Sequence, residues 1–331
     1  MNLQYRIDLL DRLGKYILSG DSQWQLAKEK AGYENGWFVP AFTALATENI
    51  ARHFLQETVL TRWAAQYEIP ASRNTPLTAG IIMAGNIPLV GFHDWLCVFI
   101  SGHNALVKPS AKDNVLIRHL VEKLGEWEPA VLQQTRFAEM LKGCDAYIAT
   151  GSNNSSRYFE YYFARYPHII RRNRTSVAVL DGTETAEEME KLADDVHQYF
   201  GLGCRNVTMI YVPRKYDFIP LLTAFKKYAY LSDHHKYKNN YDYNLALHLL
   251  NKVEYMTSGS VLLVENPSLF SPISQLHYEF YDTADGPALK GKADEIQCIT
   301  GHGFLPFGSA QSPGITDYAD GIDTLQFLTN L

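Results

Sequence analysis

Four short apolar runs, each followed by a polar or glycine-containing loop, constrain the fold of this chain most. The runs occupy residues 77–84, 105–108, 146–149 and 176–180, and helical segments at 88–100, 114–124 and 157–165 separate them. Strands that alternate with helices form βαβ units, which build a parallel sheet covered by helices. We therefore predict an α/β fold in which these runs are the parallel strands of a Rossmann-type sheet.

The loops after the first three strands are the predicted ligand-binding edge, because ligands bind beyond the carboxyl ends of parallel strands. They contain Ala84, Gly85, Asn86, Lys108, Ser110, Lys112, Thr150, Gly151 and Ser152. Glycine allows a tight turn and a close approach of the backbone to a ligand. The sequence has no GxGxxG fingerprint, so the order and spacing of the three loops carry the prediction of a dinucleotide site.

The segments around this series predict two domains. Apolar residues recur at helical spacing within 2–18 and 41–68, which indicates a helical layer before the first strand. Together with the strand series, this layer makes a predicted dinucleotide-binding domain of residues 1–182. A smaller α/β catalytic domain is predicted for 183–302, where runs at 207–212, 260–264, 272–281 and 297–300 indicate further strands.

The segment YFGLGCRN at 199–206 contains the candidate nucleophile, Cys204. Two glycines permit a tight turn before the cysteine, and the positive charge of Arg205 beside it favours the thiolate. The alternative is a structural cysteine in the core, since free cysteine is among the most buried residue types. These residues alone leave both interpretations open.

Composition excludes several classes of function. The net charge is −6 and no basic tract occurs, so we expect no nucleic-acid partner. No apolar run is long enough for a membrane span, and the charged N-terminus lacks the features of a signal peptide. The four cysteines form no CxxC pair, and the histidines at 234, 235 and 248 lack ligand spacing, so we expect no metal. Since the cysteines suggest no disulfide framework, we expect reduced thiols and a cytoplasmic location.

Five short motifs resemble those of the aldehyde dehydrogenase superfamily, and more closely those of the acyl-CoA reductase family, which includes the fatty-acid reductase of bacterial luminescence. They are AGNIP at 84–88, LVKPSA at 106–111, ATGS at 149–152, GLGC at 201–204 and LPFGSAQSPG at 305–314. The resemblance implies an aldehyde-dehydrogenase-like fold with a cofactor domain and a smaller catalytic domain. It also implies a homodimer or higher homo-oligomer in which 303–331 contacts a partner subunit, unless that segment returns to the cofactor domain.

The resemblance implies a role for each matching residue. Cys204 is the expected nucleophile, and the Asn86 amide with the Cys204 N–H is the expected oxyanion hole. Lys108 is expected to contact the adenosine ribose, and Ser152 to lie under the pyrophosphate. The chemistry agrees, because a fixed oxyanion donor is worth roughly 3–4 kcal/mol and a thiolate suits attack on a thioester. The alternatives are a turn residue at Asn86 and a solvated strand end at Lys108.

Two departures from the superfamily pattern indicate the reaction and the cofactor. Ile170 occupies about the place of the glutamate that activates water in aldehyde-oxidising members, so hydrolysis of an acyl-enzyme should be slow. The arginines at 171, 172 and 174 are expected either to meet CoA phosphates or to be solvated. Ala111 and Lys112 follow the KPS unit where NAD-preferring members often have a glutamate, which favours NADPH, with NADH as the alternative.

We therefore predict an NADPH-dependent oxidoreductase of fatty acid metabolism that reduces an acyl-CoA or acyl-protein thioester to an aldehyde through a Cys204 acyl-enzyme. One alternative is a CoA-acylating aldehyde dehydrogenase, which runs the same chemistry towards the thioester. Others are a non-redox acyltransferase or thioesterase, and a binding protein on an enzyme-derived scaffold. The EIFGP stretch of the superfamily is not recognisable, and no ribose contact is transferred to Glu295.

Overall fold

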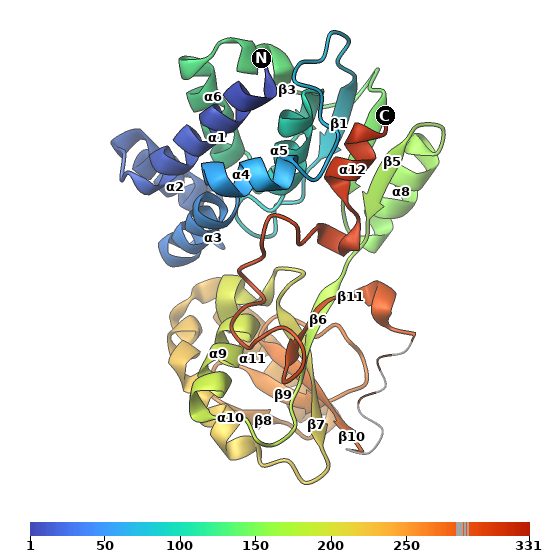
Figure 1. The fold of residues 1–331 in the computed structure, drawn as a ribbon. Helices are drawn as coiled ribbons and strands as arrows, with labels where there is room; N and C mark the ends of the chain where they lie inside the picture. Colours follow the sequence, from blue (N-terminus) through green and yellow to red (C-terminus); the bar gives the residue numbers. More distant parts are fainter. Residues whose placement is uncertain (283–286, 288, 290) are drawn as a thin grey trace. The chain divides into compact units, whose positions relative to one another are not determined.

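The structure, a computed structural model, describes residues 1–282, 287, 289 and 291–331. Contacts divide the chain into two compact units, drawn as a ribbon in Figure 1. The first unit comprises Met1–Asn173 and Pro313–Leu331, and the second comprises Arg174–Ser312. Each unit has its own sheet and is described separately below.

The sheet of the first unit is parallel and has the strand order β3-β2-β1-β4-β5. Its strands are β1 (Thr78–Ile82), β2 (Asn104–Lys108), β3 (Thr135–Phe137), β4 (Ala146–Thr150) and β5 (His168–Arg171). The chain moves outward from β1 to β3 and then returns to the other side of β1 for β4 and β5. This reversal, between β1 and β4, is where open α/β sheets bind ligands. The predicted parallel α/β fold is confirmed.

Helices before and between these strands cover the first sheet. They are α1 (Leu3–Leu18), α2 (Ser22–Glu34), α3 (Pro40–His53), α4 (Glu57–Ala64), α5 (Phe92–Ser101), α6 (Val115–Trp127), α7 (Ala130–Gln134) and α8 (Asn153–Phe163). The last segment of the chain adds α12 (Thr324–Thr329), which packs against α5 and buries Leu325 and Leu328 completely. One apolar core joins α1, α5, α6 and α12 to the sheet.

The helical region expected at 41–68 is present as two helices, α3 and α4, because the N–H groups of Phe54 and Leu55 both donate to Ile50 and end the first ladder. One helix prediction for the first unit was wrong. The helix expected from 88 begins only at Phe92, because Leu89 is left-handed at φ 56°. The Leu89 N–H instead donates to the buried carboxylate of Asp113 at 2.6 Å.

The second unit contains a six-stranded sheet with the order β11-β6-β7-β10-β9-β8, parallel except for β8. Its strands are β6 (Thr175–Val179), β7 (Val207–Pro213), β8 (Met256–Thr257), β9 (Leu262–Glu265), β10 (Gln275–Tyr281) and β11 (Ile296–Gly301). The run at 176–180 was expected to continue the first sheet, and this was wrong. Every residue of β6 is buried, and its backbone is paired on both sides, by β7 and β11.

Among the described residues, this sheet is accompanied by the α-helices α9 (Ala186–His197), α10 (Phe218–Phe225) and α11 (His235–Asn251). Short 3-10 segments of the second unit lie at Gln198–Gly201, Lys226–Asp233 and Ala293–Glu295. A further 3-10 segment, Ala319–Gly321, belongs to the first unit. The polar stretch at 233–244 is mostly the start of α11. A capping box between Thr185 and Glu188 begins α9. In the described part of the chain, each helix is too short or too polar to cross a bilayer.

A buried ion pair fastens three elements of the first unit together. Arg171, at the end of β5, donates to Asp94 of α5 and to the Thr324 hydroxyl of α12 at 2.7 Å. The Arg171 and Asp94 side chains are 3% and 9% exposed, so water screens their attraction little. Arg171, one of the three arginines expected to meet either CoA phosphates or solvent, is therefore bonded to side chains inside the first unit.

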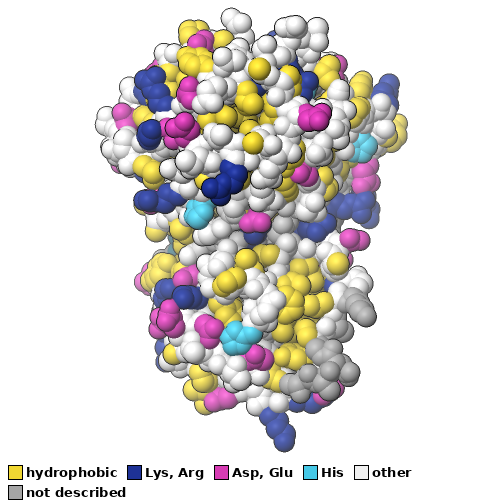
Figure 2. All heavy atoms as spheres, in the orientation of Figure 1, with side chains coloured by type: hydrophobic (Ala, Val, Ile, Leu, Met, Phe, Trp, Pro, Cys, Tyr) yellow, Lys and Arg dark blue, Asp and Glu magenta, His cyan; other side chains and the backbone are white. Residues whose placement is uncertain are grey.

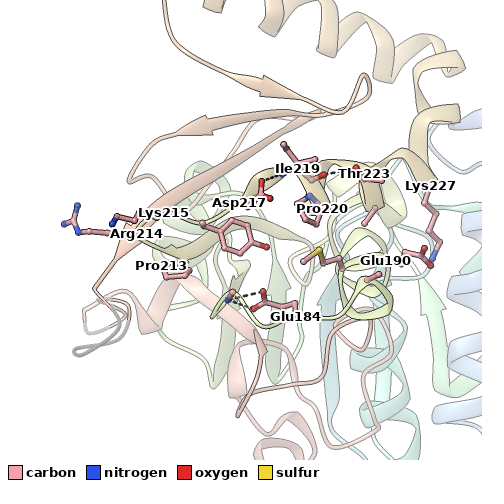
Figure 3. Close-up of a pocket in the computed structure, with 15 residues that line it drawn as sticks. Glu184, Glu190, Pro213, Arg214, Lys215, Asp217, Ile219, Pro220, Thr223 and Lys227 are labelled. Atoms are coloured by element: carbon pink, nitrogen blue, oxygen red, sulfur yellow. Dashed lines mark hydrogen bonds between the residues drawn. The ribbon is translucent and has the colours of Figure 1, made fainter.

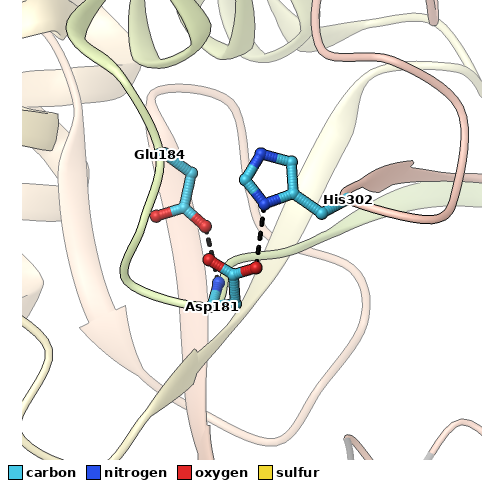
Figure 4. Close-up of side chains that lie close together, drawn as sticks. All are labelled: Asp181, Glu184 and His302. Carbon is cyan, nitrogen blue, oxygen red and sulfur yellow. Dashed lines mark hydrogen bonds and ion pairs between the residues drawn. The ribbon is translucent and has the colours of Figure 1, made fainter.

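A charged cluster joins the end of β6, the start of α9 and the loop after β11 (Figure 4). His302 Nδ1 lies 2.8 Å from Asp181 Oδ2, and its Nε2 lies 3.0 Å from Glu188 Oε1. Hydrogen bonds to these two carboxylates raise the pKa of His302 to about 9. The histidine is therefore protonated at neutral pH and links the three segments through its charge.

We expect Asp94→Ala to destabilise the protein by about 3–5 kcal/mol, because it leaves the Arg171 charge buried without its carboxylate. Urea unfolding measures this loss. The matched control is Glu160→Ala, which removes the partner of the exposed neighbour Arg172 and should cost about 0–1 kcal/mol. Equal losses in the two variants would contradict the structural role of the buried pair.

We expect His302→Gln to lower stability in a pH-dependent way. The folded pKa of His302 is raised, so its contribution is complete below the unfolded value of about 6.5 and is lost as the pH rises through about 9. The difference in Tm between wild type and variant should therefore shrink from pH 6 to pH 10, as checked by thermal unfolding. His168→Gln is the control, because this exposed ring contacts a backbone carbonyl. A difference that does not change with pH would refute the expectation.

Candidate functional site

The three predicted cofactor loops follow adjacent strands of the first sheet. Ile82 at the end of β1 is in register with Lys108 of β2 and with Ala149 of β4. The loops that begin after Ile82, Lys108 and Thr150 therefore leave the sheet at the same edge. The structure brings together Ala84, Gly85, Asn86, Lys108, Ser110, Lys112, Thr150, Gly151 and Ser152 at the carboxyl ends of three neighbouring strands.

The loop after β1 is locked against the loop after β2. A Cβ atom on Gly85 would lie 2.6 Å from both Cβ and Oγ of Ser110, so only glycine fits there. Asp113, which is 6% exposed, accepts the Leu89 N–H, and burial raises the pKa of its carboxyl to about 7. The half-buried Asn86 thus sits in a loop held at both ends. Sequence reasoning missed Asp113.

The loop after β4 leads directly into α8. Ser152 caps this helix, since its Oγ accepts the Ser155 N–H at 3.3 Å. A Cβ on Gly151 would lie 2.8 Å from the Phe159 ring, so the backbone passes close to the helix. The N-terminus of a helix carries partial positive charge and suits a phosphate group. The exposed cation Lys108 is the last residue of β2, the other neighbour of β1, and the exposed Lys112 lies in the loop after it.

Cys204 lies in the second unit, between α9 and β7, and is partly exposed. Cys97 and Cys144 are buried, and burial raises the pKa of both thiols. Cys298 is also partly exposed, and its Sγ lies 3.0 Å from the Ser176 hydroxyl. The interpretation of Cys204 as a sealed core cysteine is therefore wrong.

The segment before Cys204 has an unusual backbone. Tyr199, Phe200 and Gly201 have φ values of 53°, 58° and 74°. This left-handed conformation is unfavourable for every residue that has a side chain. The two aromatic residues are 4% and 2% exposed, and the Phe200 ring packs on His234 at 4.5 Å between centroids. Packing therefore holds a conformation that a free chain would rarely adopt.

Two further buried side chains organise this region, and sequence reasoning missed both. Asp195 of α9 is fully buried and accepts the N–H groups of Gly308 at 2.7 Å and Ala310 at 3.0 Å. Burial raises the pKa of its carboxyl to about 7. Arg205 Nη1 donates to the Ala310 carbonyl at 3.4 Å. Asp195 and Arg205, which lie on either side of the GLGC motif, therefore contact Gly308 and Ala310 of the distant LPFGSAQSPG motif within the second unit.

The second buried side chain is Asn206, whose amide is bonded throughout. Its Nδ2 donates to the carbonyls of Gln198 at 2.8 Å and Asp195 at 3.0 Å, and its Oδ1 accepts the Gly203 N–H at 2.8 Å. No local sequence pattern predicts hydrogen bonds between such distant residues. The position of Asn206, two residues after the candidate nucleophile, is the one sequence feature that could have indicated its role.

The residues at which the first departure from the superfamily pattern was predicted lie in β5 and directly after it. Ile170 is a half-buried strand residue without an ionisable group. Arg171 forms a buried ion pair with Asp94, and Arg172 pairs with Glu160 on the surface.

On the face drawn in Figure 2, acidic and basic side chains are interspersed among the described residues. A mixed face of this kind produces little long-range steering of charged partners.

Asp181, Glu184 and His302 bring ligand-type atoms within 4.8 Å of one another. The atoms already have protein partners: both ring nitrogens of His302 face carboxylates, and Glu184 accepts the backbone N–H groups of Asp181 and Gly182. Figure 4 shows Asp181 between the other two side chains. Internal hydrogen bonding accounts for this cluster without an ion.

The second unit also contains an open cavity of about 930 Å³ (Figure 3). Its walls include Met189 of α9, Pro213 at the end of β7 and Pro220 of α10, with Lys215 and Glu190 among the charged residues. Cys204 precedes the amino end of β7, whereas this cavity lies at the carboxyl end. The cavity is therefore separate from the cysteine.

Comparisons with solved structures show the fold. An indole-3-acetaldehyde dehydrogenase of P. syringae, solved with NAD+ and IAA, matches with a TM-score of 0.65 and 14% identity, over 86% of this chain and 68% of that one. Aldehyde dehydrogenase C of Pseudomonas syringae, with NAD+ and octanal, has a TM-score of 0.63 at 13% identity, over 86% and 69%. A Mycobacterium tuberculosis aldehyde dehydrogenase with NAD+ has a TM-score of 0.60 at 14% identity, over 86% and 70%.

No curated protein sequence matches the chain. The sequence profile of the LuxC acyl-CoA reductases matches residues 46–219, which is more than half of the chain and includes β1–β7, the three cofactor loops and Cys204. With the fold of the aldehyde dehydrogenases around these motifs, the chain belongs to the LuxC acyl-CoA reductase family of oxidoreductases.

Proposed function

We propose that this protein reduces an acyl thioester, with acyl-CoA as the donor, to an aldehyde through an acyl-enzyme on Cys204, and that NADPH supplies the reducing equivalents. The observation that carries the proposal is the partly exposed Cys204 in the GLGC segment, within the residues that match the reductase family. Of the other cysteines, Cys97 and Cys144 are buried, with raised thiol pKa values.

In the first step, the Cys204 thiolate attacks the thioester carbonyl and forms a new C–S bond. The carbonyl oxygen becomes an oxyanion, which the Asn86 amide and the Cys204 N–H stabilise by donating hydrogen bonds. The tetrahedral intermediate then expels CoA as its thiolate and leaves the acyl group on Cys204. A thiol nucleophile suits this exchange because the group it forms is again a thioester.

In the second step, NADPH held by the loops after β1, β2 and β4 would supply the hydride that reduces the acyl carbon of this thioester. The resulting thiohemiacetal oxygen remains with Asn86 and the Cys204 N–H. Collapse of the thiohemiacetal releases the aldehyde and restores the Cys204 thiolate. Ile170 supports reduction over hydrolysis, because it provides no base to activate water.

The first unit is the proposed cofactor domain and the second the proposed catalytic domain. Gly85 and Gly151 let the two cofactor loops pass close to Ser110 and to Phe159, and the N-terminus of α8 suits the pyrophosphate. Lys108 is the proposed ribose contact, and the exposed Lys112 the proposed contact to the 2′-phosphate of NADPH. We further infer a cytoplasmic homo-oligomer, in keeping with cysteines that form no disulfide and with the assembly that the resemblance implies.

Cys204→Ala should abolish aldehyde formation while the protein remains folded, because the proposed mechanism attaches the acyl chain to this thiol alone. The measurement is loss of NADPH absorbance with a panel of acyl-CoAs from short to long chain. Cys298→Ala is the matched control, since it removes the other partly exposed thiol of the same unit and should retain activity. A Cys204→Ala protein that still makes aldehyde would falsify the mechanism.

Lys112→Glu should lower kcat/KM for NADPH by about ten-fold or more and leave that for NADH nearly unchanged, because charge-assisted bonds to phosphate contribute about 1.5–3 kcal/mol. Steady-state kinetics with both cofactors give the ratio of kcat/KM for NADPH to kcat/KM for NADH. Lys142→Glu is the control, an exposed lysine that precedes β4 and so lies at the opposite edge of the first sheet. An unchanged ratio in Lys112→Glu would exclude this lysine as the phosphate contact.

A further inference from the structure

The peptide group between Gly203 and Cys204 is held in one orientation by Asn206. The Gly203 carbonyl accepts the Asn206 backbone N–H at 3.0 Å, and the Gly203 N–H donates to Asn206 Oδ1 at 2.8 Å. Both polar groups of Gly203 are thus bonded to a single residue. Asn206 is fully buried, so water does not compete for these bonds.

Planarity of the peptide carries this restraint to Cys204. The Gly203 carbonyl and the Cys204 N–H belong to one trans peptide and point in opposite directions. Because the carbonyl points to Asn206, the Cys204 N–H points away from it. The next peptide is also restrained, since the Cys204 carbonyl accepts the Ser176 hydroxyl at 3.1 Å. The backbone on both sides of the cysteine is therefore fixed.

The Asn206 side chain also secures the segment that precedes the turn. Its Nδ2 satisfies the carbonyls of Asp195 and Gln198, at the end of α9, where a helix leaves acceptors unpaired. Between these carbonyls and Gly203 lie the left-handed residues Tyr199 and Phe200. One amide therefore holds both ends of a strained segment whose relaxation would rotate the Gly203–Cys204 peptide.

We propose that Asn206 is a positioning residue for acyl transfer, which aims the Cys204 N–H at the developing oxyanion. It acts through the Gly203–Cys204 peptide and does not itself touch the substrate. The inference rests on the proposed function, because an oxyanion donor matters only if Cys204 attacks a carbonyl.

The test compares two reactions of the same thiol in the full-length protein. Acylation by the acyl-CoA that wild type uses best is followed by rapid quenching and intact mass. Alkylation by iodoacetamide displaces iodide at a saturated carbon and forms no oxyanion, so it reports only the thiolate. Asn206→Ala should slow acylation by about ten-fold to a hundred-fold, since complete loss of an oxyanion donor costs about 10²–10³. Alkylation should change by less than about three-fold, because thiolate access is retained.

Asn244→Ala is the matched control, since it removes another buried asparagine of the second unit, whose Nδ2 donates to the Ile273 carbonyl at 2.9 Å. It should lower thermal stability and leave both reactions at wild-type rates. If Asn206→Ala does not fold, Asn206→Gln keeps the amide but moves it by one methylene, and the same split between the two reactions is expected.

Equal acylation rates in wild type and the Asn206 variants would overturn the inference. A parallel fall in acylation and alkylation would also overturn it, because the residue would then only hold the loop together. A wild-type protein that is alkylated at Cys204 but takes no acyl group from any acyl-CoA would instead overturn the proposed function, and the inference with it. These outcomes separate the two claims.

Discussion

Backbone groups that leave regular structure at the ends of the two sheets must still find hydrogen-bond partners, and buried side chains supply them in this protein. Asp113 accepts the Leu89 N–H in the first unit. In the second unit, Asp195 accepts two N–H groups of the 308–310 loop, and Asn206 holds Gly203 and the end of α9. Each of these side chains supports a loop that carries a reductase motif.

This arrangement has an energetic consequence for the two aspartates. A buried carboxyl resists ionisation, and the pKa values of Asp113 and Asp195 are both raised to about 7. Their backbone N–H donors counteract burial but do not cancel it. An asparagine at 206 avoids this conflict, because a neutral amide both donates and accepts without a charge to desolvate. Asn206 is the nearest of these three residues to Cys204 in the sequence, and its hydrogen bonds are therefore the least sensitive to pH.

Local pattern was enough to predict the fold class and the location of the loops. The alternation of apolar runs and helices indicated a parallel sheet, and short motifs indicated Cys204 and the residues at the sheet edge. Details that depend on distant partners were missed. Pro88 looked like a helix start, but Leu89 is bonded to Asp113, 24 residues away. The run at 176–180 looked like a further strand of the first sheet, but its partners are β7 and β11, which come later in the chain.

Arg171 and Ile170 show how adjacent residues of one strand contribute in different ways. Successive side chains of a strand point to opposite faces, so the two residues meet different surroundings. Arg171 is paired inside the first unit with Asp94 and Thr324. Ile170 puts an uncharged side chain where related dehydrogenases are expected to have a base. In the proposed reaction, an acyl-enzyme then lasts long enough for hydride transfer, because water lacks the activation that would let it compete.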